Sequence, residues 1–146
     1  MHTEPVPNED HVRESFHRQG LMQTIGATLT RVGRGEAAVS APYSERLTQQ
    51  NGFLHAGVIT TLLDTACGYA AMSTAPAGYN PLAVEFKVNL LAPARGVRFE
   101  ARANVLRRGR TLTVSRADVF AISSSGDEEM VATMLQTTIL RQSTAT

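Results

Sequence analysis

The sequence lacks several features that would direct it to particular classes of protein. It has no tryptophan, aromatic residues at 5% of positions, and a single cysteine, Cys67, among 146 residues. One cysteine cannot close an intrachain disulfide, which fits a reducing compartment, and we expect a cytoplasmic protein. No apolar run approaches the roughly 20 residues that a membrane-spanning helix needs, and the polar, acidic first residues do not resemble an export signal. We therefore expect neither export nor membrane insertion.

An excess of charge of one sign is also absent. Fourteen Lys and Arg balance thirteen Asp and Glu, which leaves a formal charge of +1. Such a chain has no field strong enough to attract nucleic acid or an anionic membrane, so any anion site must be local. Histidines and acidic residues do not recur at metal-ligand spacing, and no metal site is expected. With 42% apolar and 18% charged residues, the chain should fold as one globular domain.

The pattern along the chain predicts a leader followed by a single domain. Residues 1–20 form a polar leader with a short helix, which Asn8 would cap and Gly20 would end. Residues 21–141 form the domain, and residues 142–146 form a polar tail. Within the domain, residues 21–29 alternate at strand period, residues 33–35 can turn, and residues 36–41 return as a second strand.

A long helix and four strands follow this hairpin. Residues 55–73 have helical length and apolar residues on every side, which indicates a helix buried all round. Residues 82–91, 97–105, 110–122 and 128–140 read as strands separated by turn signals. The order αββαββββ, with consecutive hairpins, predicts an α+β fold in which a mostly antiparallel sheet wraps around one central helix.

Asp64 is the residue of this helix that most needs an explanation. Its neighbours along the helix are apolar: Leu62, Leu63, Ala66 and Cys67. A carboxylate in such surroundings is costly unless it is paired or used in chemistry. An ion pair or the backbone amides of a neighbouring strand would be a structural explanation, and catalysis would be a functional one.

The start of the same helix is the second informative feature. At His55-Ala56-Gly57, unpaired N–H groups backed by the helix dipole could bind an oxyanion, although capping and close packing would also explain these residues. Ala56 and Asp64 are eight residues apart, about 12 Å along one helix, which is too far for both to act on one carbonyl group. Two such helices about a two-fold axis would bring each Asp64 to the start of the other helix. The spacing therefore predicts a homodimer with two shared sites.

Three stretches of the sequence resemble the hotdog-fold thioesterases of the phenylacetate-degradation (PaaI-like) type and the related 4-hydroxybenzoyl-CoA thioesterases. They are QQNGFLHAGVITTLLDTACGYAA, VEFKVNLLAPARG and VLRRGRTL. The resemblance implies a hotdog fold, an acyl-CoA substrate, hydrolysis of its thioester without a cofactor, and a homodimer or a dimer of dimers (a homotetramer). Which acyl group the substrate has is left open.

The resemblance also assigns roles to individual residues. Asp64 matches the catalytic carboxylate, which acts as nucleophile or as general base, and the backbone N–H of Ala56 matches the donor to the thioester carbonyl, at a position where the family usually has glycine. Gln49 matches a residue that helps to hold the carbonyl or water, and Asn51 competes for that role. His55 and Gly57 match the usual His and second Gly of the motif. Ala83 matches a position at which some relatives use a serine to orient water, and Gly68 one at which others use a threonine, so this sequence lacks both helpers.

Arginines flank a turn near the end of the third stretch. Arg107, Arg108 and Arg110 surround Gly109, where relatives place a basic turn near the phosphates of CoA. A solvated hairpin turn is the competing interpretation. Two other functions fit the sequence less well. A non-catalytic acyl-CoA sensor would be fused to a DNA-binding module, which the chain lacks. An enoyl-CoA hydratase would need a histidine after Asp64, and the sequence has none there.

Overall fold

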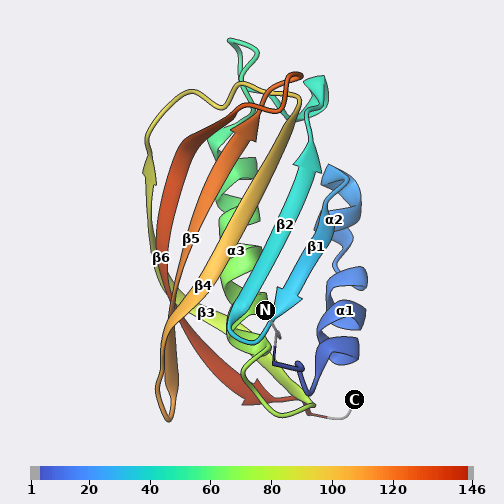
Figure 1. Ribbon diagram of the computed structural model, residues 1–146, viewed down its shortest axis with the longest axis vertical. Helices are drawn as coiled ribbons and strands as arrows, with labels where there is room; N and C mark the ends of the chain where they lie inside the picture. Colours follow the sequence, from blue (N-terminus) through green and yellow to red (C-terminus); the bar gives the residue numbers. More distant parts are fainter. Residues whose placement is uncertain (1–3, 145–146) are drawn as a thin grey trace.

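The chain forms one antiparallel sheet that curves around a long helix. The computed structural model describes residues 4–144 (Figure 1). Two short helices come first, α1 (Glu9–His17) and α2 (Gly20–Ile25). The hairpin β1 (Thr28–Gly33) and β2 (Glu36–Pro42), a 3-10 turn (Glu45–Leu47) and the long helix α3 (Ala56–Met72) follow. Four strands complete the fold: β3 (Tyr79–Leu90), β4 (Arg98–Arg108), β5 (Leu112–Ile122) and β6 (Glu128–Gln142).

The six strands form a single sheet in the order β1-β2-β4-β5-β6-β3, with every neighbouring pair antiparallel. The expected α+β architecture, an antiparallel sheet around one central helix, is therefore confirmed. Strand ends differ slightly from the sequence pattern, because β3 begins at Tyr79 rather than Leu82 and β6 continues to Gln142. Gln142 thus belongs to the sheet rather than to the polar tail, whose residues 145–146 lie outside the described residues.

Small side chains let α3 approach the sheet. The strands present alanines to the core at Ala37, Ala101, Ala103 and Ala117, each at most 2% exposed. From the helix, Leu62 and Leu63 are fully buried, and each contributes about 1.5–3 kcal/mol by leaving water.

Among residues 4–144, no helix has both the length and the apolar character required to cross a membrane.

One side of α3 stays accessible, so the prediction of a helix buried all round is wrong for the single chain. Gly57 is exposed, and Thr60, Thr61, Asp64 and Gly68 are half-buried. These positions follow helical spacing and form one stripe along the helix. Small residues and threonines do not look strongly polar in a sequence, which is why the stripe was not evident there. Asp64 therefore lies on an open face of α3 rather than in a closed core.

The segment before the first hairpin is helical, and the prediction of a strand over residues 21–29 is wrong. Met22 and Ile25, three residues apart, are 1% and 5% exposed, whereas Leu21 is 53% exposed. The buried side chains thus follow helical rather than strand period. Gly26 ends α2 in the left-handed conformation, with φ of 69°, which glycine adopts without steric cost.

The leader helix also has different ends from those expected. It ends at His17, and Gly20 opens α2 instead of closing α1. The Asn8 side chain makes no capping hydrogen bond. Its amide nitrogen instead donates to the carbonyl oxygens of Met72 and Ala75, each at 2.8 Å. Asn8 therefore fastens the leader to the end of α3. The leader joins the body of the protein through its buried apolar residues, Val12 and Phe16.

Strand β3 is an edge strand with exposed apolar side chains. Its partner on one side is β6, and its other edge has no neighbouring strand (Figure 1). Four of its apolar side chains are between 43% and 55% exposed: Leu82, Val84, Phe86 and Leu90. A long apolar edge is a template for pairing with another chain.

A bulge in β3 determines which of its residues face α3. The register with β6 shifts between Ala83 and Glu85, so that Val84 is the extra residue. Ala83 then pairs with the buried Thr138, and Phe86 pairs with the buried Gln136. The bulge turns Ala83 toward the helix, on the same face of the sheet as Phe86. Strict alternation would have put these two residues on opposite faces.

Candidate active site

The start of α3 presents one free backbone donor. His55 caps the helix: its Nδ1 accepts the backbone N–H of Gly57 at 2.7 Å, and its carbonyl oxygen accepts the N–H of Val58 at 2.9 Å. The N–H of Ala56 has no acceptor among the described residues. Of the two amides considered from the sequence, Ala56 is therefore the one open to a substrate oxygen, and Gly57 is occupied by the cap. A Cβ atom at Gly57 would lie 2.9 Å from His55 Nδ1, so the cap requires a residue without a side chain.

The loop before α3 places Gln49 beside Ala56. Gln49 N–H donates to Phe53 O at 2.9 Å, and Gly52 N–H donates to Gln49 O at 3.1 Å, with Gly52 in the left-handed region at φ of 83°. The Gln49 side-chain oxygen accepts the backbone N–H of Asn51. The amide nitrogen of Gln49 is therefore left to donate, and Gln49 lines the same cavity as Ala56. Asn51 is exposed and orients Gln49 through its backbone.

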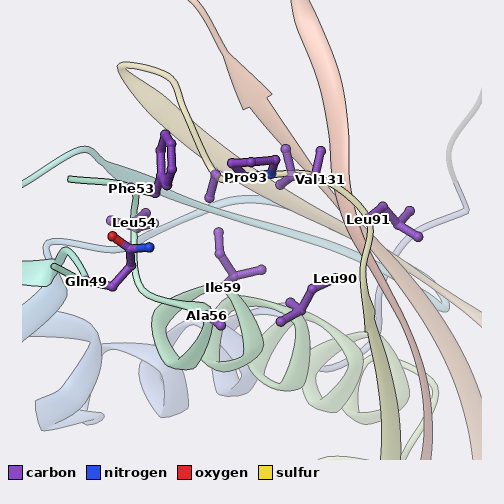
Figure 2. A pocket seen from close by; sticks show the side chains of 11 residues that line it. Gln49, Phe53, Leu54, Ala56, Ile59, Leu90, Leu91, Pro93 and Val131 are labelled. Atoms are coloured by element: carbon purple, nitrogen blue, oxygen red, sulfur yellow. The ribbon is translucent and has the colours of Figure 1, made fainter. Parts of the chain in front are cut away.

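This cavity has a volume of about 460 Å³ and is mostly apolar (Figure 2). Its walls come from the loop, the first turns of α3, the connection after β3, and β6: Gln49, Phe53, Leu54, Ala56, Ile59, Leu90, Leu91, Ala92, Pro93, Ala94 and Val131. At its rim the guanidinium carbon of Arg95 lies 5.0 Å from the centre of the Phe53 ring, a cation–π contact. The backbone N–H of Leu54 also donates to Ala94 O at 3.1 Å. These contacts join the loop to the β3–β4 connection.

Asp64 lies two turns further along α3, with its carboxylate held by one side chain. Gln136 Nε2 on β6 donates to Asp64 Oδ1 at 2.5 Å. Burial raises the pKa of Asp64 above its usual range, and the hydrogen bond from Gln136 lowers it in part. A carboxylate with a raised pKa is a better base than a solvated one. No arginine, lysine or histidine ion-pairs with Asp64 in the described part of the chain, so the ion-pair explanation for this residue is wrong.

A second, smaller cavity of about 160 Å³ adjoins Asp64. Its lining consists of Gln19, Asp64, Thr65, Gly68, Tyr69, Pro81, Leu82, Ala83 and Gln136. The two positions for which the resemblance implies a hydroxyl helper, Gly68 and Ala83, thus both line the cavity beside Asp64. A Cβ atom at Gly68 would only touch Pro81, at 3.7 Å, so packing leaves room there for a side chain.

The leader reaches this second cavity. Gln19 Nε2 donates to the hydroxyl oxygen of Tyr69 at 2.7 Å, and Ser15 Oγ lies 3.1 Å from the same oxygen. Residues from the link to α2, from α3, from β3 and from β6 therefore line the cavity beside Asp64, and Ser15 of α1 holds its wall through Tyr69. The leader contributes to the site rather than lying apart from it.

The two halves of the predicted site stand apart within one chain. The cavity beside Ala56 and the cavity beside Asp64 share no lining residue, and about 12 Å of helix separates the two residues. Each cavity nevertheless borders β3, the first at Leu90 and the second at Ala83. One chain therefore offers the donor and the carboxylate on the same side of the molecule but not around one carbonyl group.

Comparison with known proteins gives these features a family context. The thioesterase superfamily matches residues 51–125, which include His55, Ala56 and Asp64. The chain belongs to this superfamily. A solved structure of a thioesterase family protein from Silicibacter pomeroyi is 47% identical, with a TM-score of 0.89 over 92% of this chain and 98% of that one.

Two further proteins show more distant similarity to the thioesterase. The 1,4-dihydroxy-2-naphthoyl-CoA hydrolase of Listeria monocytogenes is 28% identical over 95 residues, which are 65% of this chain and 77% of that protein. The E. coli PaaI protein from the phenylacetic acid degradation operon is 19% identical and shares the fold, with a TM-score of 0.81 over 94% of this chain and 96% of that one. The expected hotdog fold and PaaI-like resemblance are confirmed, and the protein is a thioester hydrolase.

The basic turn of the thioesterase lies away from both cavities of its own chain. Arg108 Nη1 donates to Thr74 Oγ1 at 3.3 Å, just beyond the end of α3, and the β4–β5 turn lies at the opposite end of the sheet from the start of α3 (Figure 1). Arg107 and Arg110 are exposed. Gly109 is required by the turn itself, since a Cβ atom there would lie 2.6 Å from Leu112 O.

Sequence reasoning missed Gln136 and Gln19, which line the cavity beside the thioesterase's carboxylate. The inward positions of β6 read Ala132, Met134 and Gln136, so strand alternation alone could have marked Gln136 as a buried amide in need of a partner. Nothing in the sequence pattern could have paired it with Asp64, 72 residues away. Cys67 is fully buried in the core beside this carboxylate. Burial and the nearby Asp64 carboxylate raise the pKa of its thiol to about 12, so it stays a neutral core residue.

Proposed function

We propose that this thioesterase hydrolyses acyl-CoA thioesters to a carboxylic acid and CoA, at a site built by two copies of the chain. Asp64 of one copy would act with the Ala56 N–H and the Gln49 side-chain amide of the other. The observation that supports this most directly is that Asp64 lies on the accessible stripe of α3, two turns from the unpaired N–H of Ala56. The CoA ester named for the Listeria relative supports the substrate class.

Strand β3 supports the way in which the two copies would meet. Antiparallel pairing of two β3 edges about an axis at Lys87, with Val84 bulged out of register, would set Leu90 of one copy beside the partner's Ala83. The Ala56 cavity of one copy would then adjoin the Asp64 cavity of the other, because these two residues border the two cavities. The pairing would also cover the exposed apolar side chains of the edge.

The accessible stripe of α3 also supports a two-fold axis between the two copies. For Ala56 of one copy to lie beside Asp64 of the partner subunit, the axis must pass near Thr60, halfway between them. Ala83 lines the same cavity as Asp64, and Leu90 lines the same cavity as Ala56 and Ile59. We propose that the axis through the paired β3 edges and the axis beside Thr60 are one and the same. Association of two such dimers into a tetramer stays a prediction.

The proposed chemistry needs only these groups and water, with no metal or cofactor. The carbonyl oxygen of the thioester would accept hydrogen bonds from Ala56 N–H and Gln49 Nε2, which stabilise the negative charge that develops there. Asp64 would either take a proton from a water molecule whose oxygen attacks the carbonyl carbon, or attack that carbon itself. In both routes the C–S bond then breaks, and the CoA thiolate takes up a proton. In the second route, water then hydrolyses the anhydride between the acyl group and Asp64, which frees the acid and restores the carboxylate.

The experiment measures thiol release from a panel of aryl and fatty acyl-CoAs. Asp64→Asn should lower the rate by about 10²–10⁴-fold, the usual contribution of a positioned base. Asp118→Asn is the matched control, because Asp118 is a partly exposed carboxylate on the outer face of the sheet, bonded to Arg116 and Thr133. Equal release by wild type and Asp64→Asn would overturn the mechanism. Tight binding of acyl-CoA without thiol release by the wild type would instead indicate a sensor.

A further inference from the structure

Four buried polar side chains lie behind Asp64 on the inner face of the sheet. Thr113 and Ser115 on β5 pair in register with Thr138 and Gln136 on β6, and all four are at most 1% exposed. The rest of this inner face is apolar, for example Ala117, Val119 and Met134. Buried polar groups are costly unless they are hydrogen-bonded, so this group within an apolar core needs an explanation.

Two of the four form a directed chain of hydrogen bonds to the carboxylate. Thr138 Oγ1 donates to Gln136 Oε1 at 3.0 Å, and Gln136 Nε2 donates to Asp64 Oδ1 at 2.5 Å. The direction is fixed by chemistry, since an ionised carboxylate can only accept and the Gln136 oxygen must then turn to the Thr138 hydroxyl. The amide of Gln136 is thereby held in one orientation.

Only one oxygen of Asp64 is used by this chain. Asp64 Oδ1 is the atom bound to Gln136, and Oδ2 has no hydrogen-bond partner among the described residues. Asp64 is also half-buried beside the smaller cavity. The carboxylate is therefore anchored on its core side and free on the other.

We propose that Gln136, oriented by Thr138, is a positioning residue that fixes Asp64 by one oxygen so that the other oxygen meets the substrate or the attacking water. This inference rests on the proposed role of Asp64 as the reacting carboxylate. Gln136 does not touch the reacting atoms, and it acts on the rate through the orientation and the proton affinity of Asp64.

The surroundings of Asp64 make a pH profile informative. No lysine, arginine or histidine lines the cavity beside it. Tyr69 is the other titratable group in that lining, and its hydroxyl is bonded to Gln19 and Ser15. Cys67, one turn along α3, is neutral because its pKa is raised to about 12. The Gln136 N–H is thus the main polar contact that favours the ionised form of Asp64.

The test compares pH profiles of kcat/KM for acyl-CoA hydrolysis. Gln136→Met keeps the length of the side chain but removes the donor, so the acidic limb of the profile should move up by about one pH unit, which lowers kcat/KM about tenfold on that limb. Thr138→Val frees the amide to rotate and should shift the limb in the same direction by less. Gln136→His, which keeps an N–H donor, should return the limb toward its wild-type position.

Ser115→Ala is the matched control. Ser115 is fully buried next to Gln136 across the strands, and its hydroxyl has no partner among the described residues, so its loss should leave the limb in place. A Gln136→Met profile with the wild-type limb would overturn the proposal, as would a shift equally large in Ser115→Ala. Activity of Asp64→Asn equal to wild type would instead refute the proposed function, so the two failures can be told apart. If Gln136→Met does not fold, Thr138→Val still decides the outcome.

Discussion

The imidazole Nδ1 of His55 accepts the backbone N–H of Gly57 at 2.7 Å. This bond uses the donor that would otherwise compete with Ala56 for an oxyanion. It also needs a neutral imidazole whose Nδ1 carries no proton, with the remaining proton on Nε2. The first turn of α3 therefore offers a substrate one backbone N–H, that of Ala56, assisted by the Gln49 side chain.

Replacing Ala56 with proline should remove this donor with little effect on the fold. Proline is favoured at the first position of a helix, and His55 before it is already extended, at φ −62° and ψ 138°, as proline requires of its predecessor. We expect kcat for thioester hydrolysis to fall by about 10²–10³-fold, the usual effect of losing one oxyanion donor, with the melting temperature nearly unchanged. Ala56→Gly keeps the N–H and should stay active. A proline variant with wild-type kcat would exclude Ala56 as the donor.

Two inactive variants should restore one another if the site is shared. In a mixed dimer of Asp64→Asn and Ala56→Pro chains, one of the two sites combines an intact Asp64 with an intact Ala56. Random exchange of equal amounts makes half of the dimers mixed, so about a quarter of the wild-type activity should return. Activity is measured after mixing under conditions that allow subunit exchange.

The control for this mixing experiment pairs Asp64→Asn with the double variant Asp64→Asn/Ala56→Pro, which has no intact carboxylate to contribute. That mixture should stay inactive. If the first mixture also stays inactive although mixed dimers are demonstrated, the two groups do not act in trans.

Asp64 should lower the stability of the folded protein at neutral pH. Its folded-state pKa is raised mainly by burial, so between the unfolded and folded pKa values the folded state binds more protons, and the free energy of unfolding falls as the pH rises. Above the folded pKa this loss is complete. Asp64→Asn should therefore melt at a higher temperature than the wild type at pH 7, and the difference should shrink as the pH falls through the folded pKa of Asp64 toward the usual range of a carboxyl group. A lower melting temperature for the variant at pH 7 would contradict the raised pKa.

The sequence was a good guide to the sheet and to the long helix, because alternating residues such as Phe99 and Ala101, against Arg98 and Glu100, report directly which face is buried. It misplaced the segment from Leu21 to Leu29, where apolar residues fit both a strand and a short helix, and burial of Met22 against the core decides for the helix. Local pattern cannot choose between such alternatives when tertiary packing does.

Only part of the candidate site could likewise be predicted from the sequence. Asp64 could be singled out as a candidate because a carboxylate is unusual among apolar helix residues, and Ala56 because the first N–H groups of a helix are unpaired. The bulge at Val84, which turns Ala83 toward Asp64, and the bond from Gln136 depend on strand register and on contacts between distant segments. No local pattern contains that information.

The edge of β3 should be where the subunits meet. Phe86 is 43% exposed on the helix-facing side of this strand, so Phe86→Asp would place a charge in the proposed interface and should yield monomers with at least tenfold lower activity, because each monomer has only half of a site. Leu106→Asp is the control: Leu106 is 59% exposed but lies in a bulge of β4, which is three places from β3 in the sheet order, and its replacement should leave the dimer and its activity intact. Sedimentation equilibrium measures the mass of each variant in solution. If Phe86→Asp is still a dimer, the interface lies elsewhere than at β3.

The basic turn can be tested through the length of the substrate. In the proposed dimer the end of one α3 extends past Ala56 of the other, so the turn that Arg108 fastens to Thr74 would lie near the outer part of a bound CoA. Arg110→Ala should raise KM for an acyl-CoA by about fivefold, the effect of losing roughly 1 kcal/mol from a contact with phosphate, and leave KM for the matching acyl-pantetheine unchanged. Arg31→Ala, which removes an exposed arginine of β1 paired with Glu36, should affect neither substrate. If Arg110→Ala changes KM equally for the two substrates, these arginines form only a solvated turn and do not contact the phosphates of CoA.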